Sequence, residues 1–296
     1  ANSVRYQHAD PIFIDVDPQT WQMDLDLLER FFETEIVIEG GQSKLRSNGK
    51  RIKAIMPVHV LGNMCDMNRL MRLAEKYHVE VIEDASESLG TSFNGKHSGT
   101  FGKLGVLSFN GNKIITTGGG GMIITDDEQL AKKAKHLTTQ AKTLPNEYMH
   151  DEVGYNYRLV NVLAAIGVAQ MEQLPEFINK KKAINKRYRE DLDGVGDIRF
   201  QQIEPAVDCN DWLVTISTSR KQELIDYLNG NGVMVRPFWV PMNQLPMYKH
   251  DLYVSNGDQS GKVYGSCLSI PSSVGLTLEQ QGEVIGRIKE FFGKNG

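Results

Sequence analysis

Residues 108–121 read SFNGNKIITTGGGG, which places a serine five positions ahead of a lysine and four glycines shortly after it. Upstream, residues 81–87 read VIEDASE and predict a strand that ends on acidic side chains. A lysine amine can form a Schiff base with an aldehyde cofactor, a carboxylate can keep a pyridine nitrogen protonated, and a serine hydroxyl can hold a phosphate. Lys113, Asp84 and Ser108 together therefore suit pyridoxal phosphate.

Three segments in register resemble the DegT/DnrJ/EryC1/StrS family of sugar-nucleotide aminotransferases: EDASESLGT at 83–91, residues 108–121, and GYNYR at 154–158. The similarity covers nearly the whole chain from Ala1 onward. It implies an α/β chain of the fold type I of pyridoxal phosphate-dependent transferases. That fold has a large domain with a mostly parallel, seven-stranded-type sheet between helices, and a smaller α+β C-terminal domain.

The resemblance assigns roles to four residues near the lysine. Lys113 is implied as the catalytic residue, which holds the cofactor and moves a proton between two carbons. Asp84 is implied to pair with the pyridine nitrogen, Ser108 to bind the phosphate, and Glu87 to meet the ring hydroxyl. Taken alone, a lysine beside glycines is usually a solvated loop residue, and an aspartate after a strand often caps a turn. The spacing of the three segments favours the functional interpretation.

Three further residues match the family less specifically. Asn156 resembles an asparagine that reaches the phosphate of the neighbouring subunit's cofactor, which implies a homodimer with shared active sites; alone, it would be a turn residue. His59, in PVHVLG, and Arg236, in RPFW, resemble segments near the sugar-nucleotide substrate. Each of these two could equally be structural.

The resemblance implies a reaction and a substrate class. We expect ping-pong transfer of an amino group from glutamate to a nucleotide-linked 4-keto-6-deoxy sugar. Carbon 4 is favoured because Glu87 stands where many relatives have Gln or His, and a glutamate there resembles the branch that aminates this carbon. Such 4-amino sugars belong to the bacillosamine, legionaminic acid and perosamine routes of bacterial surface polysaccharides. Alternatives are a 3-aminotransferase of the same family and a non-catalytic sugar-nucleotide-binding member. A sub-branch that dehydrates sugars has histidine in place of the lysine.

The glycine run does not indicate a nucleotide loop of another enzyme class. It lacks the Gly-Lys-Ser/Thr ending of a P-loop, and the apolar residues 122–125 that follow predict a strand rather than a helix. The sequence also argues against a Rossmann oxidoreductase, because no Gly-x-Gly-x-x-Gly motif follows the first strand. Backbone freedom and close approach near a cofactor explain the glycines better.

Composition bears on the partners and the cellular location that we expect for this chain. The 296 residues are 40% hydrophobic and 24% charged with a formal charge of −4, which gives no electrostatic reason to expect nucleic-acid binding. No apolar run approaches the length of about 18 residues that a membrane span requires. Residues 1–5 show no secretion signal, and Cys65, Cys209 and Cys267 are odd in number and widely spaced. We expect free thiols, no metal site and a cytoplasmic location.

Hydrophobic periodicity predicts alternating strands and helices, and hence a doubly wound sheet. Strands are expected at 12–16, 52–58, 79–82, 105–109, 122–125, 212–216 and 232–236, and helices at 25–32, 66–78, 127–137, 159–174, 176–192, 221–229 and 278–292. Residues 39–51 are polar and contain glycine, which predicts an exposed loop. We expect a large cofactor domain over 1–175 and a small C-terminal domain over 176–296.

One expectation concerns the first residues. The segment PIFIDVD, at 11–17, resembles a family segment that lies well inside the large domain. The resemblance therefore implies a preceding segment, which in relatives supplies a glycine turn for the cofactor phosphate and an aromatic side chain that stacks on the ring.

Overall fold

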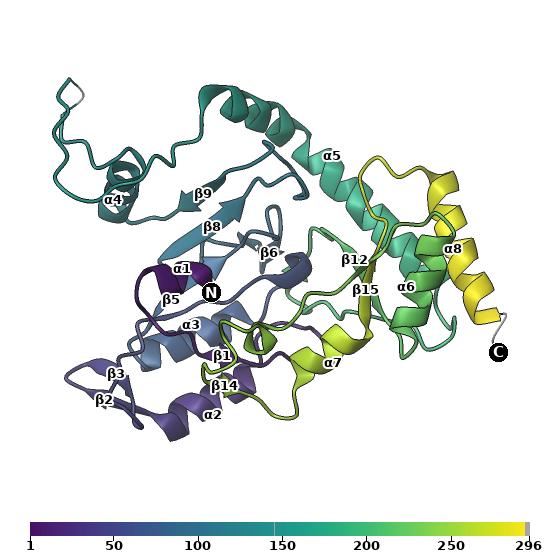
Figure 1. Cartoon of the computed structure of the whole chain (residues 1–296), viewed down its shortest axis with the longest axis horizontal. Helices are drawn as coiled ribbons and strands as arrows, with labels where there is room; N and C mark the ends of the chain where they lie inside the picture. The colour runs from purple at the N-terminus through teal and green to yellow at the C-terminus, as the bar shows by residue number, and fades with distance from the viewer. Residues whose placement is uncertain (145, 294–296) are drawn as a thin grey trace.

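The computed structural model describes residues 1–144 and 146–293. A large lobe and a small lobe are joined by the long helix α5, Asn161–Asp191, which descends from the upper centre of Figure 1 toward α6 and α8 on the right. The two lobes have separate apolar clusters. One cluster surrounds Phe32, Met67 and Leu70, and the other surrounds Tyr188 and Leu268. A third cluster lies between them and contains the residues that flank Lys113.

The large lobe is built on a four-stranded sheet. Its strands in spatial order are β4 (Ala54–Ile55), β5 (Glu80–Asp84), β8 (Leu104–Ser108) and β9 (Gly121–Ile124). Strands β4, β5 and β8 are parallel, and β9 is antiparallel at the edge. The sheet is thus mostly parallel, which confirms the expected α/β class. Within the described residues it has four strands.

Three helices of the large lobe each begin directly after an aspartate that caps them. These helices are α2 (Leu25–Glu35), α3 (Met67–Lys76) and α4 (Glu128–Thr138). The carboxylates of Asp24, Asp66 and Asp127 accept hydrogen bonds from backbone N–H groups of the first turn. Such caps satisfy donors that have no partner within the helix. The expected starts of these three helices therefore agree with the observed starts to within one residue. A short helix, α1 (Asn2–Tyr6), precedes the first strand.

We expected an exposed loop over residues 39–51, and this prediction is wrong where the structure has strands. Strands β2 (Ile36–Glu39) and β3 (Gln42–Leu45) form an antiparallel hairpin there. The turn is made by Gly40 and Gly41, both with positive φ, which is the conformation that a two-residue hairpin turn requires. The run of β-branched residues Ile36, Val37 and Ile38 ahead of the two glycines was the signal that this prediction overlooked.

The two helices expected at 159–174 and 176–192 are one continuous helix in the structure. Helix α5 contains Pro175, which lacks the N–H that would bond the carbonyl of Met171. Both residues are exposed, so water can reach the freed carbonyl. The C-terminal half buries Ile184 and Tyr188 in the small lobe, and this packing keeps the helix together past the proline.

The small lobe has an antiparallel sheet with helices beside it. The strands in order are β10 (Arg199–Phe200), β12 (Val214–Ser217), β15 (Cys267–Ile270) and β13 (Arg236–Pro237), and the helices are α6 (Lys221–Gly230), α7 (Gln259–Ser266) and α8 (Leu278–Gly293). Helices α6 and α8 pack on the sheet through the second cluster. This is an α+β arrangement, as expected.

Parts of the later chain return to the large lobe. Strand β14 (Tyr253–Val254) is parallel to β1 (Phe13–Ile14), and β11 (Val207–Asp208) pairs with β6 (Ser92–Phe93), which also pairs with β7 (Lys96–His97). Two single-turn helices, η1 (Val60–Gly62) and η2 (Met242–Gln244), complete the described elements. The domain boundary at 175 stays a prediction, and these returning strands show that the lobes are interwoven.

Two further expectations concern the whole chain. The three cysteines are free and buried, as predicted. Across the described ranges, none of the helices combines the length and the apolar character that crossing a membrane would take.

Candidate functional site

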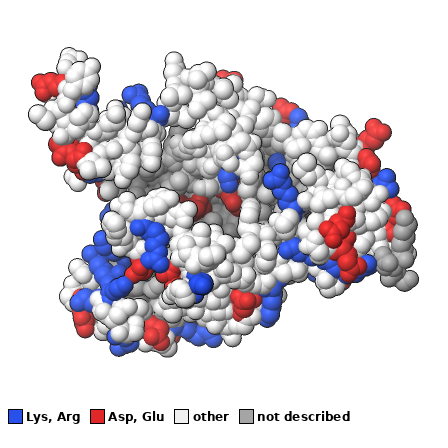
Figure 2. All heavy atoms as spheres, viewed as in Figure 1, with Lys and Arg blue, Asp and Glu red and all other residues white. Residues whose placement is uncertain are grey.

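Two of the predicted residues end neighbouring parallel strands. Asp84 is the last residue of β5 and Ser108 is the last residue of β8, and these strands pair directly. The carboxyl ends of parallel strands are where ligands bind in open α/β sheets. Figure 2 shows this face of the molecule hollowed near its centre, with acidic and basic atoms on the floor of the hollow.

The loop after β8 brings Lys113 back over this edge. The Phe109 N–H donates to the carbonyl of Gly120, and the Thr117 N–H donates to the carbonyl of Phe109. Gly118 and Gly120 have φ of 81° and 96°, a conformation that disfavours other residues. The glycines therefore supply the backbone freedom expected for them, and they let the lysine loop close on itself.

Lys113 lies between a carboxylate and an aromatic ring. Its Nζ atom is 3.6 Å from Oε1 of Glu87 and 4.1 Å from the centroid of the Trp212 ring. Both charged side chains are mostly covered, with 13% of Lys113 and 15% of Glu87 exposed. The structure thus brings Lys113 and Glu87 together, as two members of one site.

The second oxygen of Glu87 holds a strained turn. Oε2 accepts a hydrogen bond of 2.8 Å from the N–H of Leu61, a buried residue with φ of 62°. A left-handed conformation at a residue with a side chain costs roughly 1–3 kcal/mol and persists where its surroundings enforce it. Burial raises the pKa of Glu87, and the Leu61 hydrogen bond and the Lys113 charge offset only part of this effect. The nearby Asp84 carboxylate raises the pKa further.

The residues at this edge fit pyridoxal phosphate. The site offers a covered primary amine, two partly buried carboxylates and a hydroxyl at a strand end, and these are the functional groups that the cofactor requires. The Ser108 Oγ accepts one hydrogen bond of 3.4 Å from the N–H of Asn110, which leaves its own proton to donate. Among the described residues, the hydrogen bond that Asp84 accepts comes from the N–H of Ser86 to Oδ1, so Oδ2 could accept from a protonated ring nitrogen. These cofactor contacts stay predictions.

His59 is fully buried, and its Nε2 lies 2.9 Å from Oε2 of the buried Glu83. Burial alone would raise the pKa of Glu83, but the hydrogen bonds from His59 and from Gly102 and Gly99 hold it below its usual range. The pair ties the segment after β4 to β5, and Glu83 also accepts hydrogen bonds from the Gly99 and Gly102 N–H groups of the loop after β7. This favours the structural alternative for His59, and a contact with substrate stays a prediction.

Asn156 and Arg236 lie apart from the lysine contacts. Both residues are exposed. In the described part of the chain, Asn156 makes no hydrogen bond to Lys113, Asp84 or Ser108; its backbone forms a bridge with Thr139. Figure 1 shows the segment between α4 and α5, which carries Asn156, extending away from the body of the large lobe. That placement leaves the cross-subunit role of Asn156 a prediction, as does the substrate contact of Arg236.

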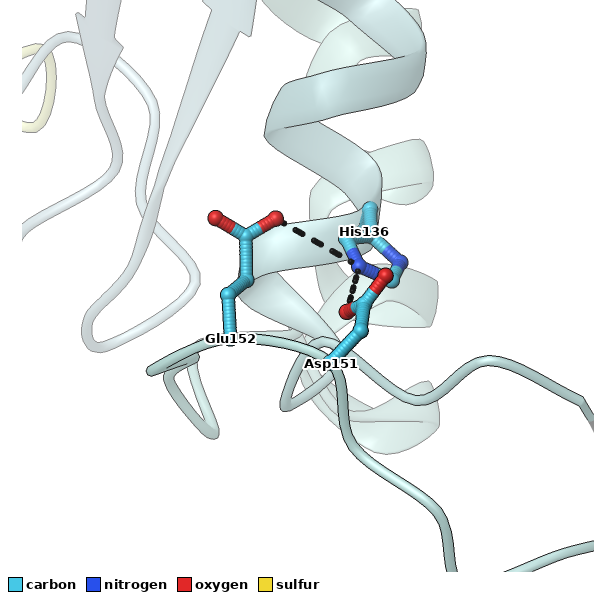
Figure 3. Close-up of side chains that lie close together, drawn as sticks. All are labelled: His136, Asp151 and Glu152. Atoms are coloured by element: carbon cyan, nitrogen blue, oxygen red, sulfur yellow. Dashed lines mark hydrogen bonds and ion pairs between the residues drawn. The ribbon is translucent and has the colours of Figure 1, made fainter.

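A separate group of titratable residues lies where this extended segment leaves α4. His136, Asp151 and Glu152 converge as Figure 3 shows, with His136 Nε2 2.7 Å from Asp151 Oδ1 and 3.6 Å from Glu152 Oε1. Lys133 also forms an ion pair with Glu152. An ammonium group in contact with one carboxylate competes with a cation there, so the group acts as an ion-pair network that holds the segment to the helix.

Trp212 is the site residue that the sequence did not reveal. A tryptophan just ahead of an apolar strand looks like an ordinary core residue, and its side chain is indeed only 1% exposed. Only the fold places its ring against Lys113. The strained Leu61 was equally hidden, although the glycine that follows it was a signal of tight packing: a side chain on Gly62 would overlap Asn210.

Comparisons with known proteins agree with this geometry. The sequence model described as the DegT/DnrJ/EryC1/StrS aminotransferase family matches residues 1–289. EpsN of Bacillus subtilis (strain 168), which carries a provisional name as a pyridoxal phosphate-dependent aminotransferase, is 37% identical over 99% of this chain and 74% of its own length. The GDP-perosamine synthase of Escherichia coli O157:H7 is 34% identical over 98% of this chain and 75% of its own length.

A solved structure shares the fold. The crystal structure of a DegT DnrJ EryC1 StrS aminotransferase from Brucella abortus has a TM-score of 0.90 at 26% identity, and the match covers 99% of this chain and 76% of that one. The expected fold is thereby confirmed: the chain has the α/β fold type I of pyridoxal phosphate-dependent transferases.

Proposed function

Because this chain belongs to the DegT/DnrJ/EryC1/StrS aminotransferase family, we propose that it aminates carbon 4 of a nucleotide-linked 4-keto-6-deoxy sugar, with glutamate as the amino donor. The enzyme class and the cofactor are those of the family: the chain is a sugar aminotransferase that uses pyridoxal phosphate. The single observation that carries the proposal is the position of Lys113, covered and 3.6 Å from Glu87 at the carboxyl edge of the sheet.

The bound cofactor supplies an electron sink that lets a proton leave the carbon bearing the amine. The protein supplies the groups around it. Lys113 would anchor the cofactor and, once displaced by an incoming amine, its Nζ would accept a proton from one carbon and return it to the other. Asp84 would hold the proton on the ring nitrogen, and Ser108 would donate its hydroxyl to the phosphate.

Glu87 would face the ring hydroxyl, where an acidic group with a raised pKa can share a proton. Burial raises the pKa of this carboxyl, so it accepts a proton more readily than an exposed glutamate does. Many relatives have Gln or His at this position, and a glutamate resembles the branch that makes 4-amino sugars. The 34% identity to a GDP-perosamine synthase supports this branch and a role in bacterial surface polysaccharides. A 3-aminotransferase is the competing assignment.

The active unit would be a two-fold dimer. Large apolar side chains are exposed along the segment that carries Asn156 and along the first half of α5. They are Tyr148, Met149, Val153, Tyr157, Val160, Val162, Ile166, Val168 and Met171. Exposed large apolar side chains that gather along two successive stretches of chain support an association site there. A two-fold contact over it would carry each Asn156 toward the partner's cofactor, since both copies use the same surface.

The remaining parts of the proposal follow from chemistry. Arg236 is exposed and makes no ion pair within the described residues, so its guanidinium is available to a diphosphate. The free, buried cysteines support a reducing cytoplasm, where sugar nucleotides would be met.

Transfer of an isotope-labelled amine from glutamate tests the proposal. The full chain with cofactor would be given 4-keto-6-deoxy and 3-keto-6-deoxy sugar nucleotides separately, and the product examined by NMR. We expect the label at carbon 4 of the first substrate, and at least ten-fold slower transfer to the second. Label at carbon 3 would replace the assignment by that of a 3-aminotransferase, and binding of either substrate without transfer would indicate a non-catalytic member.

A further inference from the structure

We infer that Trp212, from the small lobe, is the residue that positions Lys113 for its reaction. The inference rests on the proposed role of Lys113 as the cofactor-bearing lysine. Trp212 lies two residues ahead of β12, yet its ring is buried in the cluster that contains Phe109, Ile114 and Ile115 of the lysine loop. A residue of the small lobe therefore inserts into the loop of the large lobe that carries the lysine.

Trp212 contacts both the main chain and the side chain at this position. Its Nε1–H donates a hydrogen bond of 2.8 Å to the carbonyl of Asn112, the residue just before the lysine. Its ring face lies under the amine, with Nζ of Lys113 4.1 Å from the ring centroid. The Trp212 side chain thus holds both the peptide group that precedes Lys113 and the amine at the end of the lysine side chain.

The backbone of Trp212 is held on both sides, so the ring has a defined orientation. Its N–H donates to Oδ1 of Asn210 at 3.0 Å, and its carbonyl accepts from Nζ of Lys181 at 2.8 Å. The Lys181 ammonium also donates to the carbonyl of Ser272. Lys181 is buried, and this burial lowers its pKa to about 8.

Asn210 connects the tryptophan to the opposite wall of the site. Its Nδ2 donates to the carbonyls of Glu87 and Leu89, at 2.9 and 3.0 Å. The same short segment that orients Trp212 therefore also holds the segment that carries Glu87. The amine lies between the two, with the carboxylate on one side and the ring face on the other.

This arrangement addresses a specific problem of lysine chemistry. A lysine side chain carries its amine on a flexible stem of four carbons and populates many rotamers when it is unrestrained. Proton transfer requires the nitrogen within about 3–3.5 Å of the reacting atom, and a misplacement of about 1 Å can lower the rate a hundred-fold. The indole face removes conformations in which the amine turns away from Glu87. Trp212 thereby acts through Lys113 and is a positioning residue.

The first test uses the cofactor-free protein and no substrate. Lysine amines are dimethylated with isotope-labelled formaldehyde and a borane reductant, and the methyl signal of Lys113 is identified by its absence in Lys113→Arg. Because methyl groups above an indole ring resonate upfield, we expect this signal upfield of those of exposed lysines. It should move only partly in Trp212→Phe, which keeps a ring but loses the hydrogen bond to Asn112. It should reach the exposed-lysine position in Trp212→Leu.

Trp21→Phe is the matched control, because Trp21 is a buried indole of the same cluster without a contact to Lys113 among the described residues. It should leave the signal in place. In the wild-type protein, a Lys113 signal among those of exposed lysines would overturn the inference without any Trp212 variant having to fold. An unshifted signal in folded Trp212→Leu would overturn it as well.

The second test uses the cofactor-loaded enzyme. Per bound cofactor, Trp212→Phe should lower kcat by about ten- to a hundred-fold and change KM for glutamate by less than about two-fold, because the loss is one of positioning. Trp21→Phe should leave kcat unchanged. An unchanged kcat in Trp212→Phe would overturn the inference. Failure of the proposed function would be distinguishable, because the methyl shift would remain while no amine reached the sugar.

Discussion

The amine of Lys113 and the carboxylate of Glu87 face each other at 3.6 Å, although Glu87 comes from the segment after β5 and Lys113 from the loop after β8. The pairing depends on the parallel register of these two strands, which puts both of their carboxyl ends on one edge. Each partner is covered by a different element, Glu87 by the η1 turn and Lys113 by Trp212. The site is thus assembled from four stretches of chain.

Replacing Asp84 with asparagine should leave the cofactor bound and lower kcat by two or more orders of magnitude. An amide cannot hold a proton on the ring nitrogen, so the electron sink is lost. Cofactor content from absorbance and steady-state rates would be measured together. Glu80→Gln, at the other end of the same strand, is the control and should be fully active. Near-normal rates in Asp84→Asn would show that this carboxylate is structural.

Glu87→Gln should stabilise the cofactor-free protein at neutral and higher pH. Burial raises the pKa of Glu87, so the folded protein binds this proton more tightly than the unfolded chain, where the value is near 4.3. Stability then decreases as the pH rises through the folded pKa, because the buried carboxylate must ionise. Glutamine remains neutral and can still accept from Leu61.

The measurement for this prediction is urea unfolding at about pH 8 and about pH 4, the latter just below the unfolded value. The gain from Glu87→Gln should be present at the higher pH and shrink at the lower. An equal gain at both, or a loss of stability at the higher pH, would show that the charge of Glu87 is fully compensated in the fold.

Much of this architecture could be predicted from the sequence because its signals are local. Asp24, Asp66 and Asp127 precede apolar helical periods, and each caps a helix as such residues do. Strands β5 and β8 end on Asp84 and Ser108, so the carboxyl edge of the sheet could be located in advance.

The features that could not be predicted depend on long-range packing. Trp212 is 99 positions from Lys113 in sequence number (212 − 113), and nothing near either residue indicates the contact. Helix α5 continues through Pro175 because its far half is buried in the small lobe, which a local rule about proline cannot foresee. The hairpin at Gly40 and Gly41 was different, since its turn signal was present in the sequence.

The hydrogen bonds that Asp15 accepts from the segment at the start of α7 should make the free energy of unfolding depend on pH in the acidic range. Its buried carboxylate accepts hydrogen bonds from Ser255 Oγ at 2.6 Å, from the Gln259 N–H at 2.7 Å and from the Ser260 N–H at 2.8 Å. Burial alone would raise the pKa of Asp15, but these hydrogen bonds outweigh it and lower the pKa. A lowered pKa contributes stability above the unfolded value near 3.9, and the contribution is lost as the pH falls through the folded pKa.

Asp15→Ala should therefore lower the free energy of unfolding at pH 7 by about 1–3 kcal/mol, since buried donors lose their acceptor. The difference from the wild type should shrink as the wild-type protein is acidified. A pH-independent cost in Asp15→Ala would indicate lost packing rather than a lost charge.

Mixed dimers should show that Asn156 serves the partner's site. Lys113→Ala and Asn156→Ala chains would each be inactive or slow as homodimers. In a heterodimer, one site would combine the intact Lys113 of one chain with the intact Asn156 of the other, and activity should return to about half of wild type if the sites are shared. The pair should bury at least ~2,000 Å². Mixtures that stay as slow as the parents, or a fully active monomer in light scattering, would contradict the shared site.

The most direct test of the account is borohydride reduction of the cofactor-loaded protein followed by digestion and mass spectrometry. Reduction fixes the cofactor on the lysine that holds it, so we expect the added mass on Lys113 and loss of the visible absorbance band. Lys113→Ala should fold normally, show no such band and transfer no amine, whereas Lys103→Ala, on the surface at the start of β8, should behave as wild type. A cofactor fixed on any other lysine, or normal turnover in Lys113→Ala, would contradict the account.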